Sequence, residues 1–208
     1  MDGTIVNTED ISHNSFKIVC AQFGGEFTEQ HHRDILGTTG DHWSAYLIDK
    51  LSMNVNQEEF RELCSKTMEK MLHNEMHLMD GFERLVVLVK EKNIPFVLVT
   101  SSKKSSVERN FRILDLENPF DAWVTSDSVN NGKPDPEPFI LGAEKAKIDS
   151  KHCIAIEDSY SGVQSAQTSG AHVCAIPGKY SSGLDFSIAD KVFKDLNACV
   201  DEIERLIS

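Results

Sequence analysis

Apolar side chains follow two different patterns along the chain, and the pattern changes near residue 79. Before that point they recur at helical spacing, for example at Phe16, Val19, Cys20 and Phe23. Similar spacing continues over residues 43–51 and 58–72, and no β-branched run interrupts it. This half of the pattern predicts a helical block over residues 11–78.

After residue 79, short apolar runs alternate with amphipathic stretches. The predicted strands are 94–100, 122–125, 153–156, 172–176 and 191–193, and the predicted helices are 81–92, 105–114, 136–147, 162–169 and 197–207. Strands that alternate with helices indicate an α/β fold with a parallel sheet covered on both faces. We therefore expect a core domain formed by residues 1–10 and 79–208, with residues 11–78 inserted as a helical domain.

The net charge and the cysteine spacing of the chain limit the binding partners and the cellular compartment that we expect. The net charge is −12 and the pI is about 5.1, which argues against nucleic acid or an anionic membrane as the main partner. The 5 cysteines show no C-x-x-C spacing, as in proteins of a reducing compartment. No apolar run approaches the ~18 residues of a membrane span, and the polar amino end does not resemble a signal peptide. We expect a cytoplasmic monomer.

Polar residues follow several of the predicted strands where each strand ends. Thr100, Ser101 and Ser102 follow one strand, and Glu157 and Asp158 follow another. Ligands of parallel sheets bind at this carboxyl edge. Adjacent carboxylates repel unless a cation neutralises them, and their hard oxygens suit Mg²⁺. The alternative is that one carboxylate caps the following helix and the other is solvated.

Lys133 lies between Gly132 and the stiff segment Pro134-Asp135-Pro136. A lysine held in this way can neutralise a phosphate, although a lysine in a surface turn has the same local sequence. The hydroxyls and N–H groups of Thr100 and Ser101 precede a predicted helix and could cradle an anion. The alternative is that Thr100 and Ser101 only cap the helix that follows, because serine and threonine are also the usual N-cap residues.

Four stretches in this order carry a family resemblance: Asp-Gly-Thr-Ile-Val-Asn-Thr-Glu from Asp2, Val-Thr-Ser-Ser from Val99, Gly-Lys-Pro-Asp-Pro-Glu-Pro-Phe from Gly132 and Ile-Glu-Asp-Ser-Tyr-Ser-Gly-Val from Ile156. Together they resemble the haloacid dehalogenase-like phosphohydrolases, in the subgroup with a helical cap. β-Phosphoglucomutase and many sugar-phosphate phosphatases belong to that subgroup. The resemblance implies a Rossmann-like core, a helical cap and Mg²⁺-dependent hydrolysis of a small phosphate monoester, such as a phosphorylated sugar or polyol.

The resemblance also implies a role for each matching residue. Asp2 would be the general acid and base, and its backbone carbonyl would ligate Mg²⁺ together with Glu157 and Asp158. Lys133 would balance the charge of the phosphoryl group. The implied phosphate and substrate contacts are Thr100, Ser101, Ser102 and Lys133 in the core, with Arg33 and Gly37 in the cap.

The nucleophilic aspartate of the family pattern would stand immediately before Met1, at the end of a central strand, and the 208 residues contain neither. The neighbouring strands, near residues 96–99 and 153–156, would then lack a shared partner and leave a gap in the core. A shortened or wrongly assigned start and a relative without the nucleophile both remain open. We expect little phosphatase activity from these 208 residues alone.

Two other functions remain open. A sugar-phosphate mutase would need basic residues around the cap-loop glycine Gly37, and Arg33 is the nearest cation. An inactive relic that binds a phospho-ligand or a partner would retain Lys133, Glu157 and Asp158 without turnover.

Overall fold

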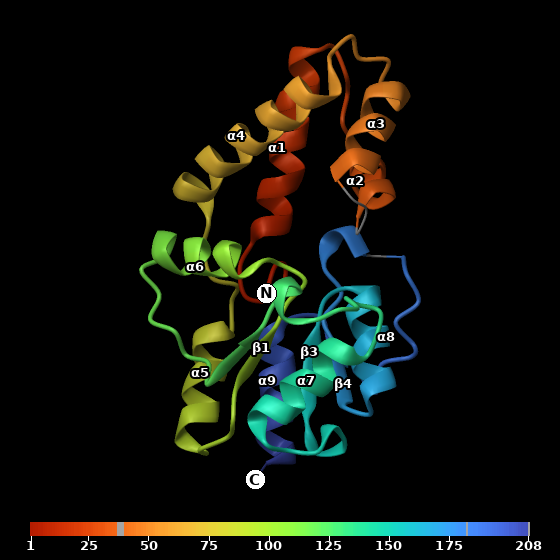
Figure 1. The fold of residues 1–208 in the computed structure, drawn as a ribbon. Helices are drawn as coiled ribbons and strands as arrows, with labels where there is room; N and C mark the ends of the chain where they lie inside the picture. Colours follow the sequence, from red (N-terminus) through yellow and green to blue (C-terminus); the bar gives the residue numbers. More distant parts are fainter. Residues whose placement is uncertain (37–39, 182, 208) are drawn as a thin grey trace. The chain divides into compact units, whose positions relative to one another are not determined.

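The computed structural model describes residues 1–36, 40–181 and 183–207 (Figure 1). The chain divides into two compact units, one formed by Met1–Val6 with His77–Ser208 and the other by Asn7–Met76. The first unit contains the strands and the second is helical, and each is described by itself below.

The helical unit contains α1 (Thr8–Gln22), α2 (Glu29–Ile35), α3 (Gly40–Lys50) and α4 (Gln57–Glu75). Its core is formed by apolar side chains from these helices and their connections, including Val19, Phe27, Leu47 and Phe60. The Asn56 side chain caps α4 by accepting hydrogen bonds from the N–H groups of Glu58 and Glu59.

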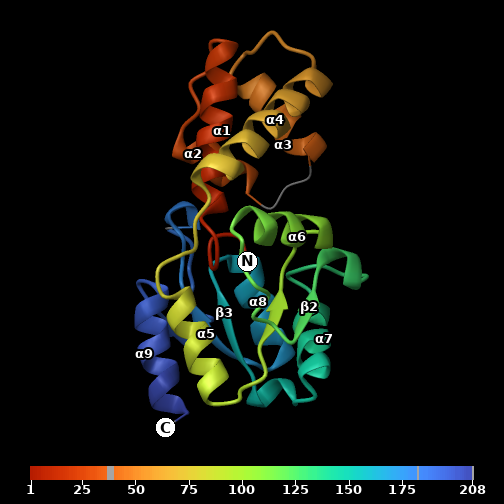
Figure 2. The ribbon, with the colours of Figure 1, turned by 90° about the vertical axis from the view of Figure 1, so that its left-hand side faces the viewer.

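The other unit alternates strands with helices, as the sequence pattern predicts. Its strands are β1 (Val97–Val99), β2 (Ala122–Val124), β3 (Ile154–Glu157), β4 (His172–Ala175) and β5 (Lys191–Val192), counted over the described residues. Its α-helices within the same residues are α5 (Phe82–Glu91), α6 (Lys104–Ile113), α7 (Glu137–Ala146), α8 (Tyr160–Ser169) and α9 (Leu196–Leu206). Figure 2 shows α5 and α9 on one side of the strands and α7 on the other. The α/β fold class is confirmed.

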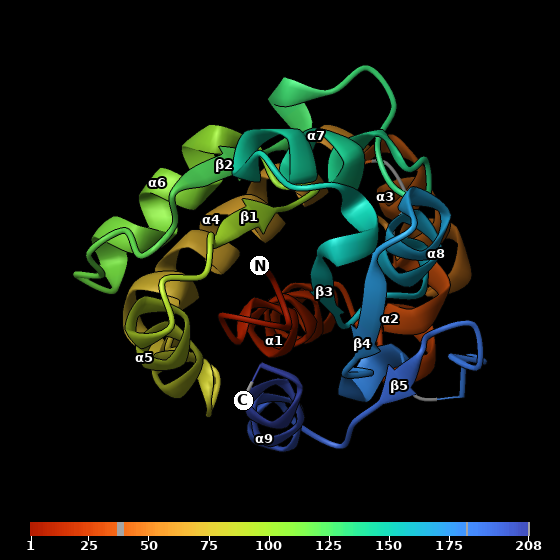
Figure 3. The ribbon, with the colours of Figure 1, turned by 90° about the horizontal axis from the view of Figure 1, so that it is seen from below.

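The strands of the described residues form two separate parallel sheets, with the orders β1-β2 and β3-β4-β5. Figure 3 shows the amino terminus in the space between β1 and β3. The interruption therefore lies where the sequence predicted a missing central strand, and both β1 and β3 are sheet edges.

The opening residues fold into a tight loop at this interruption. The Met1 carbonyl accepts hydrogen bonds from the N–H groups of Ile5 at 2.8 Å and Val6 at 3.2 Å, and Gly3 N–H donates to the Val6 carbonyl. Gly3 has φ 70°, which glycine adopts without strain. The Ile5 carbonyl accepts from the Met79 N–H, which fixes the loop to the segment that precedes α5.

The predicted strand over residues 94–100 is longer than β1. The Ile94 N–H donates to the Val89 carbonyl and so completes the end of α5, while the Phe96 N–H donates to the Asp121 side chain. Neither group is therefore available to a strand ladder. Among the described helices, none is both long and apolar enough to cross a membrane.

Candidate active site

The opening loop contacts the carboxyl ends of β1 and β3 through two side-chain hydrogen bonds. Thr4 Oγ1 donates to Asp158 Oδ1 at 2.8 Å, and Ser102 Oγ donates to Asp2 Oδ2 at 2.7 Å. Asp158 follows β3 directly, and Ser102 lies between β1 and α6. Three stretches that are far apart in the sequence thus meet at one edge of the strands, as expected for a parallel α/β fold.

Lys133 and Glu157 form a buried ion pair. Lys133 Nζ bonds to Glu157 Oε1 and donates to the Val99 carbonyl at 3.2 Å, and the two side chains are 8% and 7% exposed. Ser159 Oγ donates to the other Glu157 oxygen at 3.2 Å. The Phe139 ring lies 4.9 Å from Lys133 Nζ, within cation–π range. A buried charge is tolerated only when it is paired in this way.

Gly162, in the first turn of α8, leaves room for Glu157. A Cβ atom at Gly162 would lie 2.0 Å from Glu157 Oε2, which is closer than any real contact. The Glu157 carboxylate therefore packs directly against the α8 backbone at Gly162, and a side chain at this position would displace it from its present place.

The loop that carries Lys133 is held by a second carboxylate. Glu137 accepts hydrogen bonds from the N–H groups of Asn130 at 2.7 Å and Asn131 at 2.8 Å. These donors, Asn130 first, lower the pKa of Glu137 below its usual value. Ser165 Oγ donates to the Asp135 carbonyl at 2.5 Å and anchors the far end of the loop to α8.

The predicted phosphate-binding residues lie at the expected edge but differ in exposure. Thr100 is buried, and its hydroxyl accepts the N–H of Ser102 at 3.1 Å. Ser101 is exposed. Ser102 reaches Asp2 rather than open solvent, so the structure links it to the predicted acid and base.

The two predicted cap residues belong to the helical unit. Arg33 lies in the last turn of α2, where its guanidinium donates to Gln30 Oε1 and lies 3.9 Å from a Glu29 oxygen. Gly37 lies outside the described residues.

The atoms predicted to bind the metal are all oxygen atoms. The predicted donors are the Asp2 backbone carbonyl and the carboxylates of Glu157 and Asp158, a hard set that fits Mg²⁺, which takes one or two carboxylates and keeps waters. Among the described residues, no group of three His, Cys, Asp or Glu side chains gathers as a metal cage. The Thr4–Asp158 hydrogen bond brings the opening loop and the end of β3 together.

Sequence reasoning did not assign roles to Thr4, Ser159, Gly162 or Phe139. All four lie within the motifs or directly beside them, so their spacing from Asp2, Glu157 and Lys133 was visible. What the sequence does not contain is the contact itself, since Thr4 and Asp158 are 154 positions apart.

Comparison with known proteins gives a consistent assignment. A family model described as haloacid dehalogenase-like hydrolase matches residues 1–176. A phosphorylated carbohydrates phosphatase of Thermotoga maritima is 31% identical over 170 residues, covering 82% of this chain and 79% of that protein. A Saccharomyces cerevisiae protein provisionally named as a pseudouridine-5'-phosphatase is 32% identical over 195 residues, covering 85% of this chain and 80% of that protein.

The fold has matching solved structures. A protein of Thermotoga maritima provisionally named as a β-phosphoglucomutase superposes with a TM-score of 0.84 and 26% identity, covering 99% of this chain and 96% of that one. The motifs, the fold and the family match over residues 1–176 agree: the chain belongs to the haloacid dehalogenase-like hydrolase family, in its subgroup with a helical cap.

Proposed function

We propose that this protein is a Mg²⁺-dependent phosphatase of small phosphate monoesters. The observation that carries the proposal is the meeting of Asp2, Ser102, Lys133, Glu157 and Asp158 at one edge of the strands, through the contacts described above. An ammonium group, hydroxyls and paired carboxylates in one place are the groups that phosphoryl transfer requires.

Each side chain has one role in this proposal. Asp2 donates a proton to the leaving oxygen of the substrate and later accepts one from the attacking water. The Ser102 hydroxyl holds the Asp2 carboxylate in place. Thr100 and Ser101 contribute hydroxyl and N–H groups to the phosphoryl oxygens, and Lys133 offsets their charge.

The Asp2 carbonyl, Glu157 and Asp158 would hold Mg²⁺, which supplies charge neutralisation at the phosphoryl group when bound. Thr4 orients Asp158 by donating to Oδ1. Lys133 and Ser159 orient Glu157.

Covalent transfer requires a nucleophilic carboxylate that the 208 residues do not supply at the matching position. In the family pattern this carboxylate stands one residue before Met1. We therefore assign full turnover to a chain extended at its amino end by an apolar strand that ends in aspartate, and little turnover to the 208 residues alone.

We assign the helical unit the role of the cap, which excludes water and selects the substrate. Arg33 is the cap cation proposed to contact substrate, together with Gly37 and its loop. Relatives named for phosphorylated carbohydrates and for pseudouridine 5'-phosphate favour a sugar or sugar-like phosphate as substrate. The solved relative named as a β-phosphoglucomutase keeps a mutase as the second candidate.

The extended chain allows a direct test of the roles. Asp2→Asn and Asp158→Asn should each lower Mg²⁺-dependent phosphate release by roughly 10²-fold or more, because proton transfer and metal binding each contribute on that scale. Glu117→Gln, an exposed loop position, serves as the matched control. Unchanged turnover in either site variant would remove the assigned role.

The mutase alternative needs a different measurement. With a hexose 1-phosphate as substrate, an isomeric sugar phosphate in place of free phosphate would identify a mutase.

A further inference from the structure

Two buried cysteines of the α/β unit, Cys174 in β4 and Cys199 in α9, lie in contact. Both are 0% exposed, and both are free thiols. The Cys199 thiol donates a hydrogen bond to the Cys174 sulfur. The chemistry proposed for the candidate site uses neither of them.

The strand register places Cys174 in the middle of a row of three side chains. Cys174 is the direct partner of Ile156 in β3 and of Lys191 in β5. Partner residues of neighbouring strands direct their side chains to the same face of a sheet, because side chains alternate along each strand. Ile156, Cys174 and Lys191 therefore point to one face.

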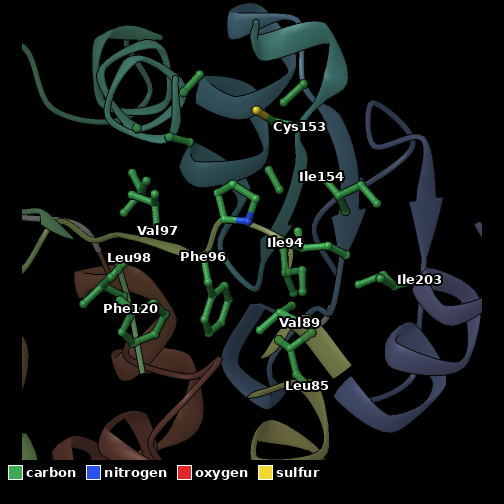
Figure 4. Close-up of a pocket in the computed structure, with 18 of the residues that line it drawn as sticks. Leu85, Val89, Ile94, Phe96, Val97, Leu98, Phe120, Cys153, Ile154 and Ile203 are labelled. Carbon is green, nitrogen blue, oxygen red and sulfur yellow. The ribbon is translucent and has the colours of Figure 1, made fainter. Parts of the chain in front are cut away.

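Helix α9 meets both ends of this row through residues on either side of Cys199. Glu202, one turn after Cys199, bonds to Lys191. Ile203 lines the same cavity as Ile156, and Figure 4 shows Ile203 at its border. At 3.6 residues per turn, Cys199 lies between Glu202 and Ile203 on the helix surface. It therefore faces the middle of the row, on β4.

The two thiols differ in acidity. The hydrogen bond from Cys199 lowers the pKa of Cys174 below its usual 9.0, and the Lys191 charge acts in the same direction. The same hydrogen bond raises the pKa of Cys199. A thiolate is the form that reacts with an oxidant, so Cys174 is the reactive member and Cys199 is the thiol that completes a disulfide.

The helical unit contains another pair of buried cysteines, which differs in this respect. Cys20 of α1 and Cys64 of α4 belong to its apolar core. Burial raises the pKa of each thiol to about 12, and Cys20 adds to the rise at Cys64. At neutral pH both groups therefore stay protonated, which makes this pair an internal control of similar burial.

We infer that Cys174 and Cys199 form a reversible oxidation site, at which hydrogen peroxide produces an internal disulfide between β4 and α9. The Cys174 thiolate attacks one peroxide oxygen, the O–O bond breaks, and the other oxygen leaves as water after taking up a proton. The Cys199 sulfur then attacks the sulfenic acid, the S–S bond forms, and a second water leaves with the Cys199 proton. The two sulfurs lose two electrons, which the peroxide oxygens gain. Local opening of the structure admits the small oxidant.

This inference is independent of the proposed function, because it needs neither Mg²⁺ nor a phosphate substrate. The test uses the 208-residue chain with Cys153→Ser, since Cys153 and Cys174 share the tryptic peptide 152–179. The folded variant is treated with hydrogen peroxide at neutral pH, then unfolded, alkylated and digested with trypsin. Mass spectrometry then identifies the linked and the alkylated cysteines.

Peptide 152–179 should be linked to peptide 195–205, which contains Cys199, and dithiothreitol should separate the two. This link should exceed any link between Cys20 and Cys64 by about tenfold or more, because a thiolate fraction changes tenfold with each pKa unit. Adding Cys199→Ala should abolish the link.

A treatment that oxidises an added cysteine peptide but leaves both Cys174 and Cys199 alkylated overturns the inference. Equal linkage of Cys20 to Cys64 also overturns it, because burial and proximity alone would then account for the reaction.

Discussion

At the scale of single residues, the Lys133–Glu157 ion pair dominates the candidate site. Both charges are almost fully buried, and each has further partners in Val99, Ser159 and Phe139. Removing one member of such a pair leaves an unpaired buried charge, whereas removing both leaves neutral groups. The pair therefore couples stability to the chemistry proposed for the site.

Lys133→Met should destabilise the chain by about 3–5 kcal/mol in the absence of Mg²⁺, since it leaves the Glu157 charge buried and unpaired. Lys133→Met combined with Glu157→Gln should recover part of that loss. The measurement is denaturant unfolding, with Lys103→Met at an exposed position as the control. Additive losses in the double variant would show that the two side chains do not act as a pair.

At the scale of elements, an ion pair between Lys191 and Glu202 connects the short strand β5 to α9. Glu202 bonds to Lys191 of β5 through one oxygen and to Arg205 through the other, the latter at 2.9 Å. The hydrogen bond from Lys191 is the main reason that the pKa of Glu202 lies below its usual 4.5. A lowered carboxyl pKa stabilises the folded state above the unfolded pKa and ceases to do so as pH falls through the folded pKa.

Glu202→Gln should therefore lower the thermal unfolding midpoint at pH 7. The difference between the variant and the unchanged chain should shrink as pH falls from 4.5 through the lower folded pKa, because the unfolded carboxylate is protonated first and the folded carboxylate afterwards. Glu117→Gln, in the exposed loop before β2, should show neither effect. A difference that stays constant from pH 7 to pH 3 would contradict the assigned role of the ion pair.

The sequence predicted most elements of the α/β unit because apolar runs and amphipathic stretches alternate there without interruption. In the helical unit, α2 was predicted only as part of the block 11–78, because its 7 residues are too few for a separate helical period to stand out. Its start is instead marked by the Thr28 hydroxyl, which accepts the N–H of His31. The predicted strand 94–100 begins too early, because the N–H groups of Ile94 and Phe96 donate to groups outside the sheet.

The types of the site residues were predictable from the motifs, but their contacts were not. Thr4–Asp158 and Ser102–Asp2 join positions 154 and 100 apart, and only the arrangement of the strands brings them together. The sequence predicted Thr100 and Ser102 as phosphate contacts, and in the structure the Thr100 hydroxyl accepts the Ser102 N–H while the Ser102 hydroxyl donates to Asp2.

At the scale of the whole molecule, the strands of the described residues form two separate sheets, β1-β2 and β3-β4-β5. Residues of β1 and β3 line a cavity of about 480 Å³, together with Met1, Thr4 and Ile5 of the opening loop. An unfilled apolar space lowers stability, because its lining loses contacts that close packing provides. In the proposed function, the nucleophile would act from a position immediately before Met1, at this interruption.

The most direct test is phosphate release from a panel of sugar phosphates and pseudouridine 5'-phosphate, with and without Mg²⁺. It compares the 208-residue chain, the chain extended by an apolar strand ending in aspartate, and the same extension ending in asparagine. We predict Mg²⁺-dependent release by the aspartate extension, at least ~10²-fold faster than by the other two. Comparable release by the 208-residue chain would contradict the assigned need for the aspartate extension, and no release by a folded aspartate extension would contradict the proposed function itself.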